Sequence, residues 1–190
     1  AIHYLIPRPP RLIAIGGLSG TGKSQLARRL APYVGAAPGA RVVRTDSTRK
    51  RLAGIALSSR LGSRGYSDEM NKRTYQAVMD ECAQVLAAGQ SAIADAVFTN
   101  PEEREAIEHV AAKAGVPFHG IWLEASPEVM QERVTRRTRN VSDANAWVVR
   151  LQLQYDPGEM TWTRLDSSGS RKETMAKARR VLNGDLETST

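Results

Sequence analysis

The sequence predicts an α/β fold in which helices cover both faces of one parallel β-sheet. Short apolar segments of strand length alternate five times with longer segments of helical periodicity. Consecutive parallel strands need a crossover connection, usually a helix, so this alternation indicates a parallel sheet. The chain has 190 residues and neither an internal repeat nor a low-complexity segment, which is typical of a single domain.

Five segments have the apolar composition and the length of buried strands. In chain order they cover 11–17, 40–47, 91–98, 116–125 and 160–168. Ligands of parallel sheets bind at the carboxyl ends of the strands. The residues that follow these segments are therefore where we expect a functional site.

The helices are predicted from their periodicity and from residues that are typical of helix ends. They cover 23–34, a short helix at 48–55, 67–89, 101–115, 126–138, 142–155 and 170–184. Ser67 and Ser126 are expected N-caps, Pro101 stands in a first turn, and Gly115 follows a helix end. The segment 56–66 has no periodicity and is predicted to be a mobile loop.

The composition is that of a globular protein, with 41% hydrophobic residues, 25% charged residues and a net charge of +7. A basic net charge is compatible with a nucleic-acid partner or with small anionic substrates. Aromatic residues are only 5% and are not interleaved with the arginines, which disfavours the stacking of single-stranded nucleic acid without excluding nucleic acid or phosphate binding. No apolar run is long enough for a bilayer, and prolines interrupt the first residues, so we expect no membrane association and a cytoplasmic location. The context of Cys82 favours a buried packing thiol over a reactive one.

The stretch GGLSGTGKS contains the motif G-x-x-x-x-G-K-[ST], formed by Gly17, Gly22, Lys23 and Ser24. Glycines let backbone N–H groups turn inward around phosphate oxygens, and the following helix adds the positive end of its dipole. Lys23 is expected to reach the outer phosphates, and Ser24 to offer its hydroxyl to Mg²⁺. Because the motif lies between a predicted strand and a predicted helix, it predicts a loop that holds a nucleoside triphosphate, which we interpret as ATP.

Two carboxylates indicate what happens to the phosphate. A motor-type ATPase usually ends a strand with Asp followed by Glu, whereas here Asp95 is followed by Ala96. A kinase instead needs a carboxylate that accepts the proton of the acceptor hydroxyl, and Asp46 is our candidate. Asp46 could also cap the helix expected to start at Ser47, and the two roles are compatible. Asp95 is expected to hold a water on Mg²⁺ or to bind the acceptor.

Arginines gather in the segment EVMQERVTRRTRN, at positions 133, 136, 137 and 139. Arg133 and Arg137 are spaced i, i+4 and therefore share one helix face. Arginines this close repel one another unless an anion lies between them, which suits a lid over the triphosphate. We expect this lid at about 133–145; a solvated basic helix is the alternative.

Together these pieces resemble the small P-loop kinases of the AAA_33 type, especially a kinase domain often found attached to an aminoglycoside phosphotransferase-like domain. The resemblance covers nearly the whole chain and rests on PPRLIAIGGLSGTGKS, RTDSTRKRLAG, AIADAVFTNPEER, FHGIWLEA, RVTRRTRNVSDA and LDSSGS. It implies a P-loop NTPase with an adenylate-kinase-like three-layer α/β/α fold, ATP and Mg²⁺ as cofactors, Asp46 as the base and lid arginines at Arg133 and Arg137. By the same resemblance, Arg49 and Arg104 face the acceptor.

Two departures from the family pattern affect these expectations. Related polynucleotide kinases tend to carry Asp-x-Thr-Asn after the third strand, where this chain has DAVF, and this disfavours nucleic acid as the acceptor. Asn140 stands where an acidic lid residue is expected. The opening IHYLIPRPP resembles a linker, so we expect a tail or linker at 1–10, the kinase domain at 11–190 and, as one implied partner, a fused N-terminal phosphotransferase-like domain.

The sequence therefore predicts an ATP-dependent kinase that acts on a hydroxyl of a small polar metabolite, sugar-like or aminoglycoside-like. The alternatives are a polynucleotide 5′-hydroxyl kinase and a nucleotide-binding regulatory module of a larger protein. The expected catalytic residues are Lys23, Asp46, Arg133 and Arg137. The expected ATP-binding residues are Gly17, Ser19, Gly20, Thr21, Gly22, Lys23, Ser24, Gln25, Arg133, Arg137, Ser168 and Gly169. The expected acceptor-binding residues are Asp46, Arg49, Asp95, Phe98 and Arg104, and the expected metal ligands are Ser24 and Asp95.

Overall fold

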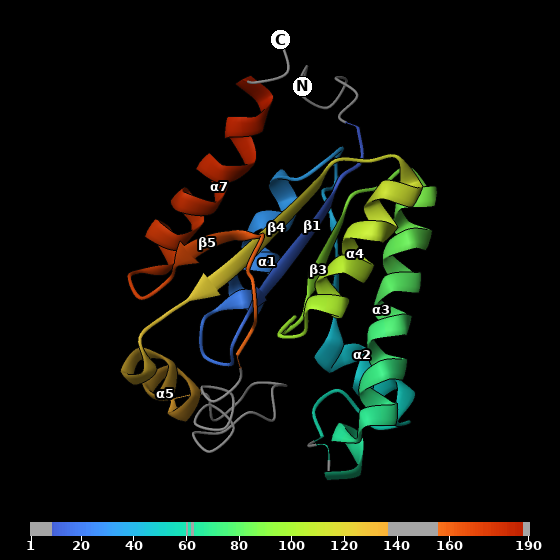
Figure 1. The fold of residues 1–190 in the computed structure, drawn as a ribbon, viewed down its shortest axis with the longest axis vertical. Coiled ribbons are helices and arrows are strands. Elements are labelled where there is room, and N and C mark those ends of the chain that lie inside the picture. The colour runs from blue at the N-terminus through green and yellow to red at the C-terminus, as the bar shows by residue number, and fades with distance from the viewer. Residues whose placement is uncertain (1–8, 60, 62, 137–155, 188–190) are drawn as a thin grey trace.

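In the computed structural model, five strands form one parallel sheet in the order β2-β3-β1-β4-β5 (Figure 1). The structure describes residues 9–59, 61, 63–136 and 156–187. The strands are β1 (Leu12–Gly17), β2 (Arg41–Arg44), β3 (Ala92–Asp95), β4 (Phe118–Glu124) and β5 (Thr163–Asp166). The predicted fold class is confirmed, and each strand is shorter than its predicted segment.

Helices lie between successive strands, as the alternating pattern predicts, and one more follows the last strand. They are α1 (Lys23–Leu30), α2 (Thr45–Leu52), α3 (Asp68–Ala87), α4 (Pro101–Ala114), α5 (Pro127–Thr135) and α7 (Arg171–Glu187). The predicted N-caps are confirmed, because Ser67 Oγ accepts a hydrogen bond from Met70 N and Ser126 Oγ accepts one from Val129 N. The helix predicted at 142–155 lies outside the described residues. Of the helices that are described, none is both long and apolar enough to cross a bilayer.

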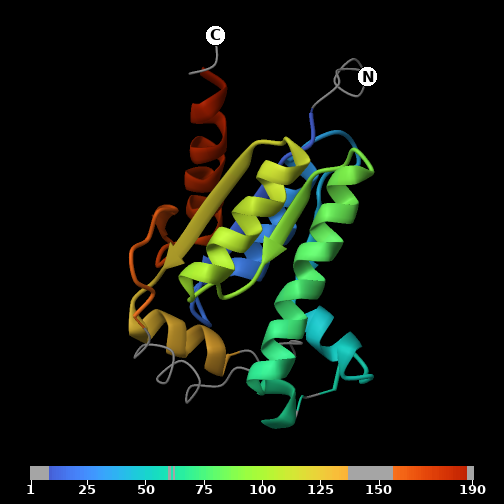
Figure 2. The same cartoon turned by 45° about the vertical axis from the view of Figure 1, so that its right-hand side comes forward.

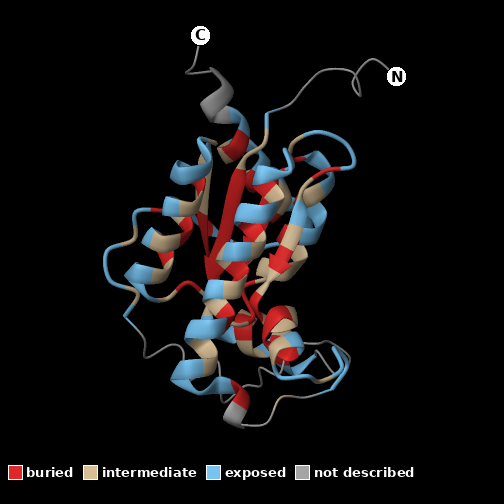
Figure 3. Cartoon of the chain, turned by 90° about the vertical axis from the view of Figure 1, so that its right-hand side faces the viewer, coloured by how far each residue is buried: buried red, intermediate tan, exposed pale blue. Residues whose placement is uncertain are grey.

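Two hydrophobic layers hold the helices against the sheet. Helices α3 and α4 lie on one face, and α1 and α7 lie on the other (Figures 1 and 2). Successive side chains of a strand point to opposite faces, so Leu12 of β1 packs in the layer of α3 and α4, while Ile13 packs in the layer of α1 and α7. Since both faces are covered, all six residues of β1 are buried, and buried residues concentrate along the sheet (Figure 3).

The carboxyl ends of β1, β2 and β3 bring three chain segments together. The glycine-rich loop follows β1, and in the register of the sheet Arg44 at the end of β2 lies beside Asp95 at the end of β3. The sequence predicted a second strand that continues to residue 47. Instead β2 ends at Arg44, where its pairing with β3 ends, and α2 begins at once with Thr45. Asp46 therefore stands in the first turn of a helix and not in a strand.

Candidate active site

The glycine-rich loop between β1 and α1 adopts backbone conformations that favour glycine. Gly17, Gly20 and Gly22 have φ angles of +129°, +93° and +98°, in the left-handed region. A Cβ atom at Gly20 would also lie 2.6 Å from the carbonyl oxygen of Met130. Gly22 directly precedes α1, so the first N–H groups of this helix face the loop. The loop therefore has the backbone shape that surrounds phosphate oxygens.

Side chains of the same motif hold this loop closed on itself. Thr21 Oγ1 donates to the carbonyl oxygen of Leu18 at 2.7 Å, and Lys23 Nζ donates to the same oxygen at 3.0 Å. Lys23 thus lies inside the curve of the loop, where it can also reach a bound anion.

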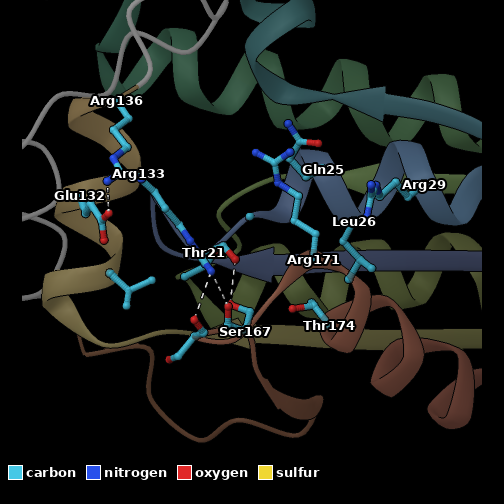
Figure 4. A pocket seen from close by; sticks show the side chains of 13 residues that line it. Thr21, Gln25, Leu26, Arg29, Glu132, Arg133, Arg136, Ser167, Arg171 and Thr174 are labelled. Carbon is cyan, nitrogen blue, oxygen red and sulfur yellow. Dashed lines mark hydrogen bonds and ion pairs between the residues drawn. The ribbon is translucent and has the colours of Figure 1, made fainter.

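A larger cavity lies beside the loop, between α1, α5 and the start of α7 (Figure 4). Its volume is about 580 Å³. Its walls are linked by hydrogen bonds: Ser167 Oγ donates to the carbonyl oxygen of Thr21 at 2.8 Å, and Arg133 Nη2 donates to the carbonyl oxygens of Ser167 at 2.9 Å and Gly169 at 3.0 Å. The residues that line this cavity are Thr21, Gly22, Gln25, Leu26, Arg29, Val129, Glu132, Arg133, Arg136, Ser167, Ser168, Arg171 and Thr174.

Several of the expected ATP-binding residues therefore line this cavity, and Arg133 forms part of its wall. Its side chain extends from α5 across to the segment after β5 (Figure 4). From the sequence, Arg133 is expected in a lid over the triphosphate. In the structure its guanidinium donates hydrogen bonds to backbone carbonyls of the segment after β5. Arg137, Arg139, Asn140 and the rest of the expected lid lie outside the described residues.

A second, smaller cavity lies between the glycine-rich loop and the ends of β2 and β3. It measures about 80 Å³, and its walls include Lys23, Ser24, Arg44, Asp46 and Asp95. The side chain of Asp95 is only 4% exposed, and its Oδ2 accepts a hydrogen bond from Arg44 Nε at 2.9 Å. The other end of the same guanidinium, Nη2, donates to Ser24 Oγ at 3.1 Å. The structure thus brings both carboxylates identified in the sequence to the glycine-rich loop.

Asp46 lines this cavity together with residues of the loop. Its Oδ2 is 3.6 Å from Arg44 Nη2. Burial and the nearby charge of Asp95 raise the pKa of Asp46, while Arg44 and Lys23 lower it in part. Among the described residues, no side chain caps the N-terminus of α2, and Arg44 occupies the N-cap position. Asp46 is therefore a carboxylate of raised basicity inside the site, and the geometry does not assign it to capping.

Arg44 lines the smaller cavity and is not among the site residues expected from the sequence. Its position just before Asp46 was visible in the segment RTDST. Its pairing with Asp95, 51 residues away, depends on β2 lying next to β3. The sequence does contain a signal for this pair, because Arg44 is a cation and Asp95 a carboxylate, and both stand near the carboxyl ends of predicted strands.

Arg49 is placed differently from the expectation that it faces the acceptor. Its side chain is buried, and Nη1 donates to Asn71 Oδ1 at 2.6 Å and to the carbonyl oxygen of Gly65 at 3.1 Å. The guanidinium also lies over the ring of Tyr66, 5.2 Å from its centroid. Arg49 thus joins α2 both to α3 and to the segment before it, and we assign it to holding these parts together.

Phe98 and Arg104 are also buried, with 1% and 3% of their surfaces exposed. The ring of Phe98 packs edge-on against the rings of Tyr75 and Trp162 in the core. Arg104 donates hydrogen bonds to four backbone carbonyl oxygens on two chain segments. The expectation that both line the acceptor pocket is not supported by this geometry, because neither side chain has a surface open to a small molecule.

The comparison with known proteins identifies the family. The AAA_33 model, described as an AAA domain, matches residues 12–156. The chain belongs to the AAA_33 family. The resemblance expected from the sequence is therefore confirmed, whereas the fused phosphotransferase-like domain stays a prediction.

Curated relatives of this AAA_33 chain include an uncharacterised protein of Mycobacterium tuberculosis, which is 30% identical over 186 residues. That match covers 94% of the chain but only 36% of the mycobacterial protein, so the chain spans about a third of its length. A shikimate kinase of Caulobacter vibrioides is 31% identical over 136 residues, which cover 70% of the chain and 60% of the relative.

Solved structures show the same fold at low sequence identity. A gluconokinase from Sinorhizobium meliloti has a TM-score of 0.64 at 21% identity, with 96% of this chain and 99% of that chain covered. The APS kinase of Mycobacterium tuberculosis, solved with AMPPNP and APS, has a TM-score of 0.64 at 20% identity, with 93% and 99% covered. The AAA_33 chain therefore has the α/β fold of P-loop kinases.

Proposed function

We propose that this chain is an ATP-dependent kinase that transfers the γ-phosphoryl group of ATP to a hydroxyl of a small polar metabolite, sugar-like or aminoglycoside-like. A bond forms between the acceptor oxygen and the γ-phosphorus, and the bond from the γ-phosphorus to the bridging oxygen of ADP breaks. The proton of the acceptor hydroxyl passes to a carboxylate, and the products are ADP and a phosphate monoester.

One observation carries this proposal. A single cavity is lined both by Lys23 and Ser24, which directly follow the glycine-rich loop, and by Asp46. A triphosphate held by the loop therefore ends where a carboxylate of raised pKa can accept a proton. The residue after Asp95 is the buried Ala96, so the strand end lacks the second carboxylate that would orient a water for hydrolysis.

The larger cavity suits the nucleoside part of the substrate. It lies against the same loop and has both apolar walls, such as Leu26, and backbone groups after β5. Ser167 ties this wall to Thr21, so the nucleoside cavity and the phosphate loop keep a constant relative position. Constant placement of the reacting groups is the main contribution of a protein to phosphoryl transfer.

The residues present fit a magnesium ion at the loop. Ser24 and Asp95 supply the hydroxyl and carboxylate oxygens that this hard cation prefers, and it usually takes only one or two protein ligands together with phosphates and waters. The guanidinium of Arg44 donates hydrogen bonds to both of these oxygens, so they face the same small region of the site. When bound, the metal would neutralise negative charge on the phosphates.

The relatives support a kinase of small metabolites. The names of three of them are shikimate kinase, gluconokinase and APS kinase. They differ in the acceptor that they name, so the sugar-like or aminoglycoside-like acceptor stays a prediction made from the sequence.

The first experiment measures Mg·ATP binding by calorimetry and acceptor-dependent ADP release across a panel of hydroxyl metabolites. With the acceptor that responds, we expect Asp46→Asn to lower kcat at least about 100-fold, the usual contribution of a general base, and to change the Kd of Mg·ATP less than about threefold. Asp80→Asn on α3 is the matched control. Asp80 accepts a hydrogen bond from Gln76 of the same helix and does not line either cavity of the site, so kcat should not change. Normal turnover in the Asp46 variant would reject the proposed base.

The other two candidate functions are outcomes of the same experiment. Transfer of label from ATP to an oligonucleotide with a 5′-hydroxyl, in the absence of transfer to metabolites, would indicate a polynucleotide kinase. Tight Mg·ATP binding without acceptor-dependent ADP release would indicate a regulatory module. Absence of Mg·ATP binding by the folded chain would overturn all three.

A further inference from the structure

The guanidinium of Arg44 lies among the same three side chains to which the proposed function assigns the metal and the base. Its Nε is 2.9 Å from Asp95 Oδ2, and its Nη2 is 3.1 Å from Ser24 Oγ and 3.6 Å from Asp46 Oδ2. The side chain is 18% exposed, so these contacts are partly protected from water. This is the arrangement of a bound cation, in which oxygen atoms from three separate elements converge on one positive group.

Arg44 and a magnesium ion cannot both occupy this position. Magnesium binds its oxygen ligands at about 2.0–2.1 Å, much closer than the contacts that the guanidinium makes here. A metal on Ser24 Oγ would lie within a few ångströms of Arg44 Nη2, where two positive charges in a partly buried site repel strongly. The hydrogen bond from Arg44 to Ser24 must therefore break when the metal binds.

We propose that Arg44 is a built-in cation that competes with Mg²⁺ for Ser24 and Asp95, so that binding of the metal–nucleotide complex displaces the guanidinium from Ser24. This inference rests on the proposed function, because it assumes that the loop binds nucleotide. It assigns Arg44 two effects. Arg44 neutralises the carboxylates of Asp46 and Asp95 when metal is absent, and it reduces the advantage that Mg²⁺ gives to nucleotide binding.

A purely structural role for Arg44 would have a different consequence. A guanidinium that only joins the ends of β2 and β3 would affect stability and would leave the metal dependence of binding unchanged. The contact with Ser24 distinguishes the two roles, because Ser24 lies in the first turn of α1, directly after the glycine-rich loop, and in neither strand. The readout must therefore be the dependence of binding on metal.

The experiment measures the Kd of ATP by calorimetry, once in excess EDTA and once in saturating Mg²⁺. The readout is the Kd in EDTA divided by the Kd in Mg²⁺. In Arg44→Gln we expect this ratio to be at least tenfold larger than in the wild type. Mg²⁺ then no longer has to displace the guanidinium, which lowers the Kd in Mg²⁺, and ATP without metal no longer has the positive charge of Arg44 nearby, which raises the Kd in EDTA. Arg44→Lys should raise the ratio at least threefold, since one ammonium cannot bridge both oxygens. Arg41→Gln is the matched control, because Arg41 is on the same strand, is 60% exposed and pairs with Glu81.

A second readout needs no nucleotide. Titration of the free chain with Mn²⁺, followed by electron paramagnetic resonance, should show binding to Arg44→Gln at least tenfold tighter than to the wild type. Should Arg44→Gln fail to fold, Arg44→Lys decides the question by the same two measurements. Ratios within twofold of the wild type in the folded variants would overturn the inference while leaving the proposed function intact. Failure of the wild type to bind ATP would instead overturn the proposed function.

Discussion

Arg104 offers the sharpest test of the difference between family resemblance and geometry. The resemblance implies contact with the acceptor, whereas within the described residues the structure shows a buried side chain that bonds to four backbone carbonyls. Nη1 donates to Phe98 and Thr99, both at 2.9 Å, and Nη2 donates to Pro157 at 2.7 Å and Glu159 at 3.0 Å. Arg104 thus joins the loop after β3 to the segment before β5.

The expected cost of Arg104→Ala follows from these four hydrogen bonds. A buried carbonyl left without its donor costs about 1–3 kcal/mol. Only the bond to Phe98 is fully buried, so water replaces part of the others, and the loss is about 3–5 kcal/mol in total. For a domain of this size each kcal/mol lowers Tm by about 2–4 °C, so we expect Tm to fall by roughly 6–20 °C.

The assay is thermal unfolding followed by circular dichroism, with Arg41→Ala as the control. Arg41 is 60% exposed and forms a surface ion pair with Glu81, which contributes no more than about 1 kcal/mol. A Tm of Arg104→Ala within the range of this control, together with a raised acceptor KM, would refute the structural role. It would restore Arg104 to the acceptor site.

Three further predictions concern the loop, the base and the thiol. Gly20→Ala should raise the Kd of Mg·ATP at least tenfold, because φ is +93° and the added methyl would contact backbone 2.6 Å away. Burial and the charge of Asp95 raise the pKa of Asp46 above its ordinary value of 3.8, so the folded chain binds the Asp46 proton more tightly than the unfolded chain does. Ionisation of Asp46 therefore lowers the stability of the fold as the pH rises above 3.8. Asp46→Asn should therefore have a higher Tm than the wild type at pH 7, and the gain should vanish below pH 3.8. Burial raises the pKa of Cys82 to about 12, so a thiol reagent at pH 8 should label it only after unfolding.

Each of these predictions has its own control. Gly89→Ala is the control for Gly20→Ala, because Gly89 has a similar positive φ of +77° but open space around the added methyl. Equal effects of the two variants on nucleotide binding would contradict the prediction for the loop. The same Tm gain for Asp46→Asn at pH 3 and pH 7 would contradict the second. Labelling of Cys82 in the native chain as fast as in urea would contradict the third.

Much of the site was accessible from the sequence because it depends on residues that are close together in the chain. The glycine-rich loop is such a case, since the φ angles of Gly20 and Gly22 and the position of Lys23 follow from residue type and spacing within one turn of backbone. The strands and most helices were equally predictable, because hydrophobic periodicity and caps such as Ser67 act over a few residues. The exact end of β2 was not predictable from the sequence, because it depends on the pairing of β2 with β3.

The tertiary structure decided which charged side chains meet. Arg44 and Asp95 are 51 residues apart, and they bond because β2 lies next to β3 and not next to β1, an order that the linear sequence does not state. The arginines expected at the acceptor, Arg49 and Arg104, are instead buried against backbone carbonyls that the packing of distant segments delivers. A sequence lists the charges that a chain carries; only the packed sheet and its loops determine which of them remain near the substrate and which are used to hold the fold together.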